Sequence, residues 1–299
     1  MEDRLLVTAS PHIRDHSTTR GLMGNVVIAL LPAVLASALI FGARALLLVV
    51  VTTFACVAFE YIYERLLHKT NTVGDLSAVV TGIILALNMP VGMPIWIAVV
   101  GAFVAIVITK QLFGGLGYNF ANPALVGRIV LFLGFTSRMT AYVYPDMAVD
   151  ALASATPLAS SVDRHAVSLL DMFLGLHGGM MGEVCVLAIL LGFAYLVATK
   201  TIQATIPVTI VATVFILTTL NTGDPYAALI ECMSGGLLFG SVFMATDYVT
   251  SPFTTKGKLF YGVFIGLITF LIRHFGSMNE GMSLSLIHIS EPTRLALIS

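Results

Sequence analysis

The sequence predicts an all-α membrane protein, a polytopic helical bundle, and three observations support this fold class. Of the 299 residues, 58% are hydrophobic and 10% are charged, whereas soluble domains have about 45–50% apolar and about 25% charged residues. The apolar residues form long continuous runs, most of them close to the roughly 20 residues of a spanning helix. A membrane β-barrel would instead have short alternating segments. The net charge of −1 gives no reason to expect nucleic acid as a partner.

Nine apolar runs are expected to be spans, five in residues 22–136 and four in residues 182–283. Residues 1–21 precede them, are mixed in charge and lack the apolar core of a signal peptide, so we expect an extramembrane segment. Gly42, Asn88 and Pro90 are examples of the residues that punctuate the run ends. The runs lie at about 22–42, 45–64, 76–90, 94–109, 120–136, 182–199, 203–220, 227–246 and 258–275.

The distribution of lysine and arginine predicts a cytoplasmic N-terminus. In that orientation nine of these residues lie in cytoplasmic segments and five in outside segments, and cytoplasmic loops are the ones that carry an excess of positive charge. The long hydrophilic segment, residues 137–181, then lies outside the cytoplasm.

Two glycine-rich interruptions predict broken helices at membrane depth. Residues 113–119 contain three glycines, after which Asn122-Pro123 is expected to open a shorter helix, and Ser234-Gly235-Gly236 interrupts the eighth run. Non-helical backbone is tolerated at this depth where it is buried in protein or lines a cavity. Because the two breaks occupy comparable positions in the two halves, we expect an inverted repeat of five spans each.

Ionisable residues near the spans are candidates for a functional role, because a charge in the bilayer costs several kcal/mol unless it is paired or hydrated. We expect most of them to reach the interface from a nearby span end, and only Glu60 and Glu231 lie clearly inside a run. A structural or interfacial role is the favoured interpretation, and conduction of Na⁺ or H⁺ is the alternative for Glu60, Asp75, Glu231 and Asp247. The other members of the set are Glu64, Arg128, Glu183 and Arg273.

Cysteine and histidine give no metal or catalytic pattern. The three cysteines are scattered through apolar runs, where we expect buried small residues, and the histidines lack ligand spacing and are expected to be solvated or capping residues. We therefore predict no metal site and no catalytic acid–base pair on this chain.

The segment 137–181 contains a small-residue stretch, Asp150 to Ala159, in which Pro157 favours an extended Thr156 with an accessible hydroxyl. On these residues alone, a plain polar turn is the favoured interpretation and covalent modification the alternative. Residues 165–176 have apolar residues at helical spacing and are expected to lie on the membrane surface.

The string Ser154-Ala155-Thr156-Pro157-Leu158-Ala159 resembles the flavinylation motif of the D-type membrane subunit of Rnf complexes (ferredoxin:NAD⁺ oxidoreductases) and of its relative, the B-type subunit of the sodium-translocating NADH:quinone reductase. Other stretches similar to this family follow in the expected order over residues 10 to 283. They begin at Ser10-Pro11-His12, Asp75-Leu76-Ser77, Lys110-Gln111-Leu112, Phe243-Met244-Ala245, Ser251-Pro252-Phe253 and Ile272-Arg273.

The resemblance implies FMN attached to Thr156 through a phosphoester, installed outside the cytoplasm by a flavin transferase that recognises Asp150. Ser154-Ala155 stands where the family commonly has Gly-Ala. Noncovalent riboflavin is a further family-level expectation that no residue here places. The implied protein has ten spans, lies in a bacterial or archaeal cytoplasmic membrane with other Rnf subunits, and couples ferredoxin:NAD⁺ electron transfer to Na⁺ or H⁺ translocation.

A secondary transporter or channel without redox function is the alternative, because broken helices, repeats and intramembrane carboxylates suit that class equally. A purely structural scaffold is a third, weaker option.

Residues 284–299 differ from the rest of the chain. A charge and a proline interrupt what should be a tenth apolar run, and the string resembles a translated sequencing-adapter fragment. We expect this tail not to belong to the natural protein.

Overall fold

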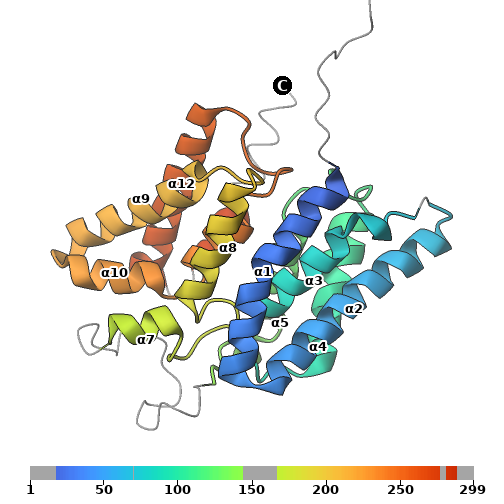
Figure 1. Cartoon of the computed structure of the whole chain (residues 1–299), viewed down its shortest axis with the longest axis horizontal. Coiled ribbons are helices and arrows are strands. Elements are labelled where there is room, and N and C mark those ends of the chain that lie inside the picture. Colours follow the sequence, from blue (N-terminus) through green and yellow to red (C-terminus); the bar gives the residue numbers. More distant parts are fainter. Residues whose placement is uncertain (1–17, 70, 144–166, 277–280, 288–299) are drawn as a thin grey trace, which may run out of the picture.

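The computed structural model describes residues 18–69, 71–143, 167–276 and 281–287, and within these ranges every regular element is helical (Figure 1). The first group of elements comprises α1 (Thr19–Phe41), α2 (Ala43–Leu66), η1 (Val73–Asp75), α3 (Ser77–Leu87), α4 (Ile95–Phe103), η2 (Val104–Gln111), α5 (Pro123–Gly134) and α6 (Thr136–Met139). The second comprises α7 (Leu169–Leu174), α8 (Val186–Ala198), α9 (Thr205–Thr222), α10 (Pro225–Met233), α11 (Leu237–Phe243) and α12 (Thr255–Phe275).

All nine predicted runs contain helices, but their lengths differ. Four helices, α1, α2, α9 and α12, are long and apolar enough to cross a membrane, and α10 with α11 forms a fifth candidate bent by 55°. The other four runs contain shorter apolar helices, namely α3, α4 with η2, α5 and α8. A polytopic membrane bundle is therefore supported, whereas nine full-length spans are not, because turns shorten these four helices.

Local sequence sets the helix ends as predicted. Gly42, with a φ of 75°, separates α1 from α2. The Asn122 side chain accepts the backbone N–H groups of Ala124 and Leu125, and Pro123 starts α5, as expected because proline has no N–H to lose in a first turn. The broken backbone predicted at residues 113–119 is also confirmed, since Gly114, Gly115 and Gly117 all have positive φ.

The two helix groups form two halves joined along α1 and α8 (Figure 1). In the first half α2 packs against α3 and α4, and in the second half α9 packs against α10, α11 and α12. The backbones of α1 and α8 approach each other closely where the halves meet. A Cβ atom at Gly192 of α8 would overlap the carbonyl oxygen of Ala29 of α1. Small residues allow this kind of contact between membrane helices.

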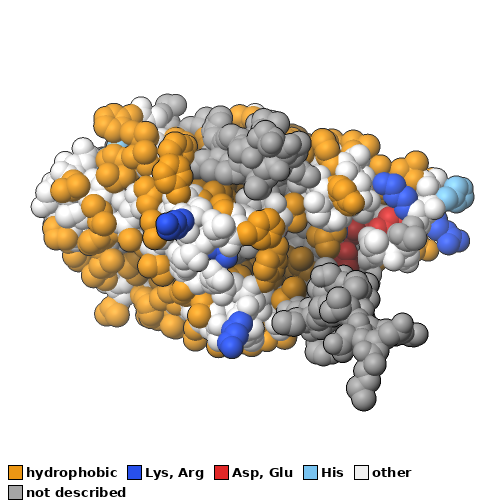
Figure 2. Space-filling view, turned by 90° about the horizontal axis from the view of Figure 1, so that it is seen from above, with side chains coloured by type: hydrophobic (Ala, Val, Ile, Leu, Met, Phe, Trp, Pro, Cys, Tyr) orange, Lys and Arg blue, Asp and Glu red, His pale blue; other side chains and the backbone are white. Residues whose placement is uncertain are grey.

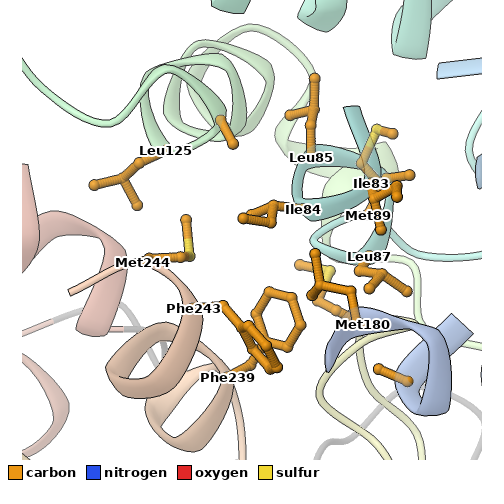
Figure 3. Packing of buried hydrophobic residues seen from close by; sticks show 14 of the residues in the cluster. Ile83, Ile84, Leu85, Leu87, Met89, Leu125, Met180, Phe239, Phe243 and Met244 are labelled. Carbon is orange, nitrogen blue, oxygen red and sulfur yellow. The ribbon is translucent and has the colours of Figure 1, made fainter. Parts of the chain in front are cut away.

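The core continues across both halves. Figure 3 shows Leu87 of α3 near Phe239 and Phe243 of α11, with Met180 beside them. Because side chains from both halves fill one apolar cluster, the halves share a core.

Candidate functional site

The flavinylation motif lies outside the described residues, as do Asp150, Ser154, Ala155 and Thr156. The nearest described element on its C-terminal side is α7, within the segment that was predicted to lie on the membrane surface. Leu170 and Leu174 of α7 are exposed, whereas Met172 is buried, so this helix has one packed and one free apolar face.

A buried polar network, the Glu60 cluster, lies at the end of the first half. Glu60 is fully buried, and its Oε1 atom accepts hydrogen bonds from Lys110 Nζ at 2.5 Å and from Gln111 Nε2 at 2.9 Å. Lys110 Nζ also donates to Ser77 Oγ at 2.5 Å. The second oxygen of Glu60 has no hydrogen-bond partner among the described residues. One carboxylate is thus held by a buried ammonium ion on one oxygen and left open on the other.

The network continues outward through two further carboxylates. Glu64, also buried, accepts from the hydroxyl and the backbone N–H of Thr72. Asp75 Oδ1 accepts from the hydroxyl and the N–H of Ser77. Because Thr72 is exposed and Asp75 half-buried, hydrogen-bonding groups lead from the surface to Glu60. Figure 2, which looks onto this end of the bundle, shows the acidic side chains gathered on one side.

The helix that carries Lys110 has an unusual form. Residues 104–111 form η2, a π-helix in which the N–H of Leu112 donates to the carbonyl oxygen of Val107. π-helical turns are rare and are frequent at functional sites. Here this turn places Lys110 and Gln111, which are adjacent in sequence, both within hydrogen-bonding distance of Glu60.

A second buried ion pair joins the two halves. Arg128 of α5 donates to Glu183 Oε1 at 3.1 Å and to the side-chain oxygen of Asn88 at 2.7 Å. All three side chains are buried. The pair abuts the α10–α11 break, because a Cβ atom at Gly236 would lie 2.8 Å from Glu183 Oε1.

Burial corrects the interfacial prediction for most of these charges. Glu64, Arg128 and Glu183 do not reach the interface from nearby helix ends but are at most 3% exposed. The physical reason is pairing, since each finds a charged or hydrogen-bonding partner from another part of the chain. Lys110, which directly follows the apolar run 94–109, is buried for the same reason.

The second half has its own polar cluster, the Glu231 cluster. Buried Glu231 accepts from the Thr218 hydroxyl at 3.2 Å and lies 3.7 Å from His274 Nε2. Arg273 donates to the backbone carbonyl oxygens of Glu231 and Ser234, at 2.8 and 3.1 Å. The guanidinium therefore satisfies carbonyl groups that the break after α10 leaves without helical partners.

A cavity of about 90 Å³ lies between the halves, and one of the predicted residues, Asp247, lines it. Ser77 and Lys110 line it from the first half and Asp247 from the second. Asp247 follows α11, is half-buried, and accepts the N–H of Val249 at 3.3 Å. Burial raises the pKa of Asp247 to about 6, although the Val249 hydrogen bond opposes this shift.

The solvated role predicted for histidine is wrong for His177. Its ring lies buried before α8, and Nδ1 is 3.1 Å from the carbonyl oxygen of Gly178. Burial lowers the pKa of this imidazole, so it is held in its neutral form. Of the cysteines, Cys56 and Cys232 are buried as expected, and Cys185 is half-buried.

Comparison with known protein families identifies the family of this chain. The model of the NQR2, RnfD, RnfE family matches residues 6–290. The chain belongs to this family. Among its similar relatives is the D subunit of the Na⁺-translocating ferredoxin:NAD⁺ oxidoreductase complex of Acetobacterium woodii, 43% identical over 98% of this chain and 93% of the relative.

Two further relatives in the NQR2, RnfD, RnfE family have nearly equal coverage. The D subunit of the proton-translocating ferredoxin:NAD⁺ oxidoreductase complex of Clostridium ljungdahlii is 35% identical over 97% of this chain and 92% of its own length. The D subunit of an ion-translocating oxidoreductase complex of Actinobacillus succinogenes is 30% identical over 94% of this chain and 92% of its own length.

Within the described ranges, no group of three His, Cys, Asp or Glu side chains is placed to hold a metal ion. Sequence reasoning missed the partners of the buried charges. These are Lys110 and Gln111 for Glu60, Thr72 for Glu64, and the pairing of Arg128 with Glu183. A signal was available, because a lysine directly after an apolar run and an arginine inside one each require a nearby anion.

Proposed function

We propose that this chain is the flavin-carrying membrane subunit of an Rnf-type complex, which couples electron transfer between reduced ferredoxin and NAD⁺ to translocation of Na⁺ or H⁺. The observation that carries the proposal is the nearly full-length match to three proteins named as D subunits of such complexes. The flavinylation motif around Thr156 supports it independently. Covalently held FMN would supply the one- and two-electron chemistry that side chains lack.

This chain would contribute the attachment site for FMN and part of the path for the translocated ion. Thr156 would hold FMN through a phosphoester, with Ser154, Ala155 and Asp150 forming the sequence that a flavin transferase recognises. The N-terminus would be cytoplasmic, which puts residue 156 outside the cytoplasm of a bacterial or archaeal cell. The other Rnf subunits would supply the ferredoxin and NAD⁺ sites.

The ion path would use the buried carboxylates. Glu60 and Asp75 belong to a network that leads from the exposed end of the first half to Ser77 and Lys110. These two residues line the cavity between the halves together with Asp247. Glu231 would belong to the ion path near the opposite side of the membrane. Helix α12 starts at the same end of the bundle as the Glu60 cluster and is about 30 Å long, and Arg273 near its other end binds the backbone of Glu231 in α10. About 90 Å³ is room for roughly three water molecules, which suits a hydrated path.

The packing supports the inverted repeat that this proposal includes. The arrangement of α2 with α3 and α4 parallels that of α9 with the α10–α11 pair and α12. We propose that residues 22–136 and 182–283 are these repeats, separated by the flavin-bearing segment 137–181, and that residues 284–299 are not native. Riboflavin receives no assigned residues, because no residue of the sequence places it.

Flavin fluorescence tests the redox proposal. We expect the full chain, co-produced with a flavin transferase and separated under denaturing conditions, to give a fluorescent flavin band, and Thr156→Ala to abolish it. Ser160→Ala, directly after the small-residue stretch, is the matched control and should keep the band. A wild-type band without fluorescence would favour the alternative of a secondary transporter, which the bent α10–α11 pair and the buried carboxylates also suit.

A further inference from the structure

A second pocket, which we call the lysine pocket, opens at the end of the bundle where α1, α9 and α12 begin. Its volume is about 270 Å³, several times the roughly 30 Å³ share of one water molecule. Its polar lining residues are Lys200, Thr201, Gln203, Thr246, Tyr248, Ser251 and Lys258, and its apolar ones are Leu22, Ile202 and Ile206.

The charge of this pocket is positive. Lys200 follows α8, and its ammonium group has no hydrogen-bond or ion-pair partner among the described residues, whereas Lys258 donates to Gln203 at 2.8 Å. None of these lining residues is acidic. On the side of this end that belongs to α8, α9 and α12, Figure 2 shows basic groups without acidic neighbours, whereas the acidic side chains gather on the first half.

The backbone adds to this positive potential. Gln203 and Ile206 flank the start of α9, an 18-residue helix whose first turn has no capping side chain. Lys258 lies in the first turn of α12. Helix starts carry unsatisfied N–H groups and the positive end of the helix dipole, and both favour an anion.

The depth of the pocket identifies the kind of anion. Helices α1, α9 and α12 are candidate membrane spans, and the pocket lies at the level where all three start. That is the level of lipid headgroups, where clustered lysines attract anionic lipids. Leu22 and Ile206 provide apolar wall that suits the start of an acyl chain.

We propose that the lysine pocket binds the phosphodiester headgroup of an anionic phospholipid. Lys200 and Lys258 contact the phosphate oxygens, and the hydroxyl of Ser251 offers a further hydrogen bond. None of the pocket's lining residues belongs to the Glu60 cluster, although Ile202, Thr246 and Tyr248 also line the cavity between the halves. The proposal does not use Thr156, so its test is independent of the redox proposal.

Native mass spectrometry of the full chain in a neutral detergent tests the site. Phosphatidylglycerol is added to the wild type, to Lys200→Gln/Lys258→Gln and to Lys256→Gln, with phosphatidylcholine as the zwitterionic comparison. Lys256 is the matched control because it is exposed on the same turn of α12 but does not line the pocket. Each lysine near a membrane surface contributes about 1 kcal/mol to anionic lipid binding, so the double variant should lose about 30-fold in affinity for the first bound lipid.

The wild type and Lys256→Gln should bind phosphatidylglycerol equally and prefer it to phosphatidylcholine. Equal losses in the double variant and in Lys256→Gln would overturn the proposal, since they would show general surface attraction only. Soluble glycerol 1-phosphate forms the second arm. If it protects the wild type against thermal unfolding as well as the lipid does, the lipid assignment is wrong. Melting temperatures without lipid establish that all variants are folded.

Discussion

The Glu60 cluster on α2 and the Glu231 cluster on α10 each bury a carboxylate in one half of the bundle, but the cations beside the two carboxylates bind differently. Glu60 is paired with a buried ammonium ion, Lys110, at 2.5 Å. Glu231 receives a hydroxyl at 3.2 Å, while the neighbouring Arg273 binds backbone carbonyl oxygens of the helix break. In the first cluster the cation thus binds the carboxylate itself, whereas in the second Arg273 binds backbone carbonyl oxygens and His274 Nε2 lies 3.7 Å from Glu231.

The largest effect should come from breaking the ion pair of the Glu60 cluster. Lys110→Met leaves Glu60 buried and unpaired, and removing one partner of a buried pair costs about 3–5 kcal/mol. We expect a sharp loss of folded protein in detergent, measured by size-exclusion chromatography with thermal challenge. Glu60→Gln/Lys110→Met should recover most of the loss, and exposed Lys256→Met should have none. A single variant as stable as the double would contradict the pairing.

Sequence reasoning predicted the local features of this comparison better than the pairings. The caps at Gly42 and Asn122 and the breaks at residues 113–119 and 234–236 follow from backbone preferences of a few adjacent residues, so they could be predicted. The partners Glu60 and Lys110 are 50 positions apart, and Arg128 and Glu183 are 55 apart. A hydropathy pattern treats each charge alone, so it left Glu60 inside a run without a partner and assigned Arg128 and Glu183 to the interface.

A smaller effect distinguishes the two carboxylates directly. In Glu231→Gln an amide oxygen can still accept from Thr218, whereas the contact of the carboxylate with His274 is weakened, so we expect a loss of about 1 kcal/mol. Glu60→Gln should cost more, because it leaves Lys110 as a buried cation without its anion. Thermal unfolding of both variants in the same detergent gives the comparison, and equal losses would show that the two clusters are neutralised alike.

The smallest effect concerns Asp247, which faces Lys110 across the cavity from the second half. Its pKa of about 6 lies above its ordinary value of 3.8, so the folded state binds the proton more tightly. The stability from this proton is present below about pH 4 and is lost as the pH rises through 6. Asp247→Asn should match the wild type at pH 4 and exceed it by about 1–2 kcal/mol at pH 8, allowing for partial exposure.

Melting temperatures of the two proteins between pH 4 and pH 8 measure this difference. A constant difference across the range would mean that the carboxyl group has an ordinary pKa and that the cavity is better hydrated than its lining indicates.

The central claim is that this chain carries covalent flavin on Thr156, and the intact mass of the full chain co-produced with a flavin transferase tests it most directly. We predict a single adduct with the mass of FMN less one water, located by peptide fragmentation on Thr156 and missing from Thr156→Ala. An unmodified wild-type mass, obtained while the same transferase modifies the Acetobacterium woodii relative in parallel, would contradict this claim.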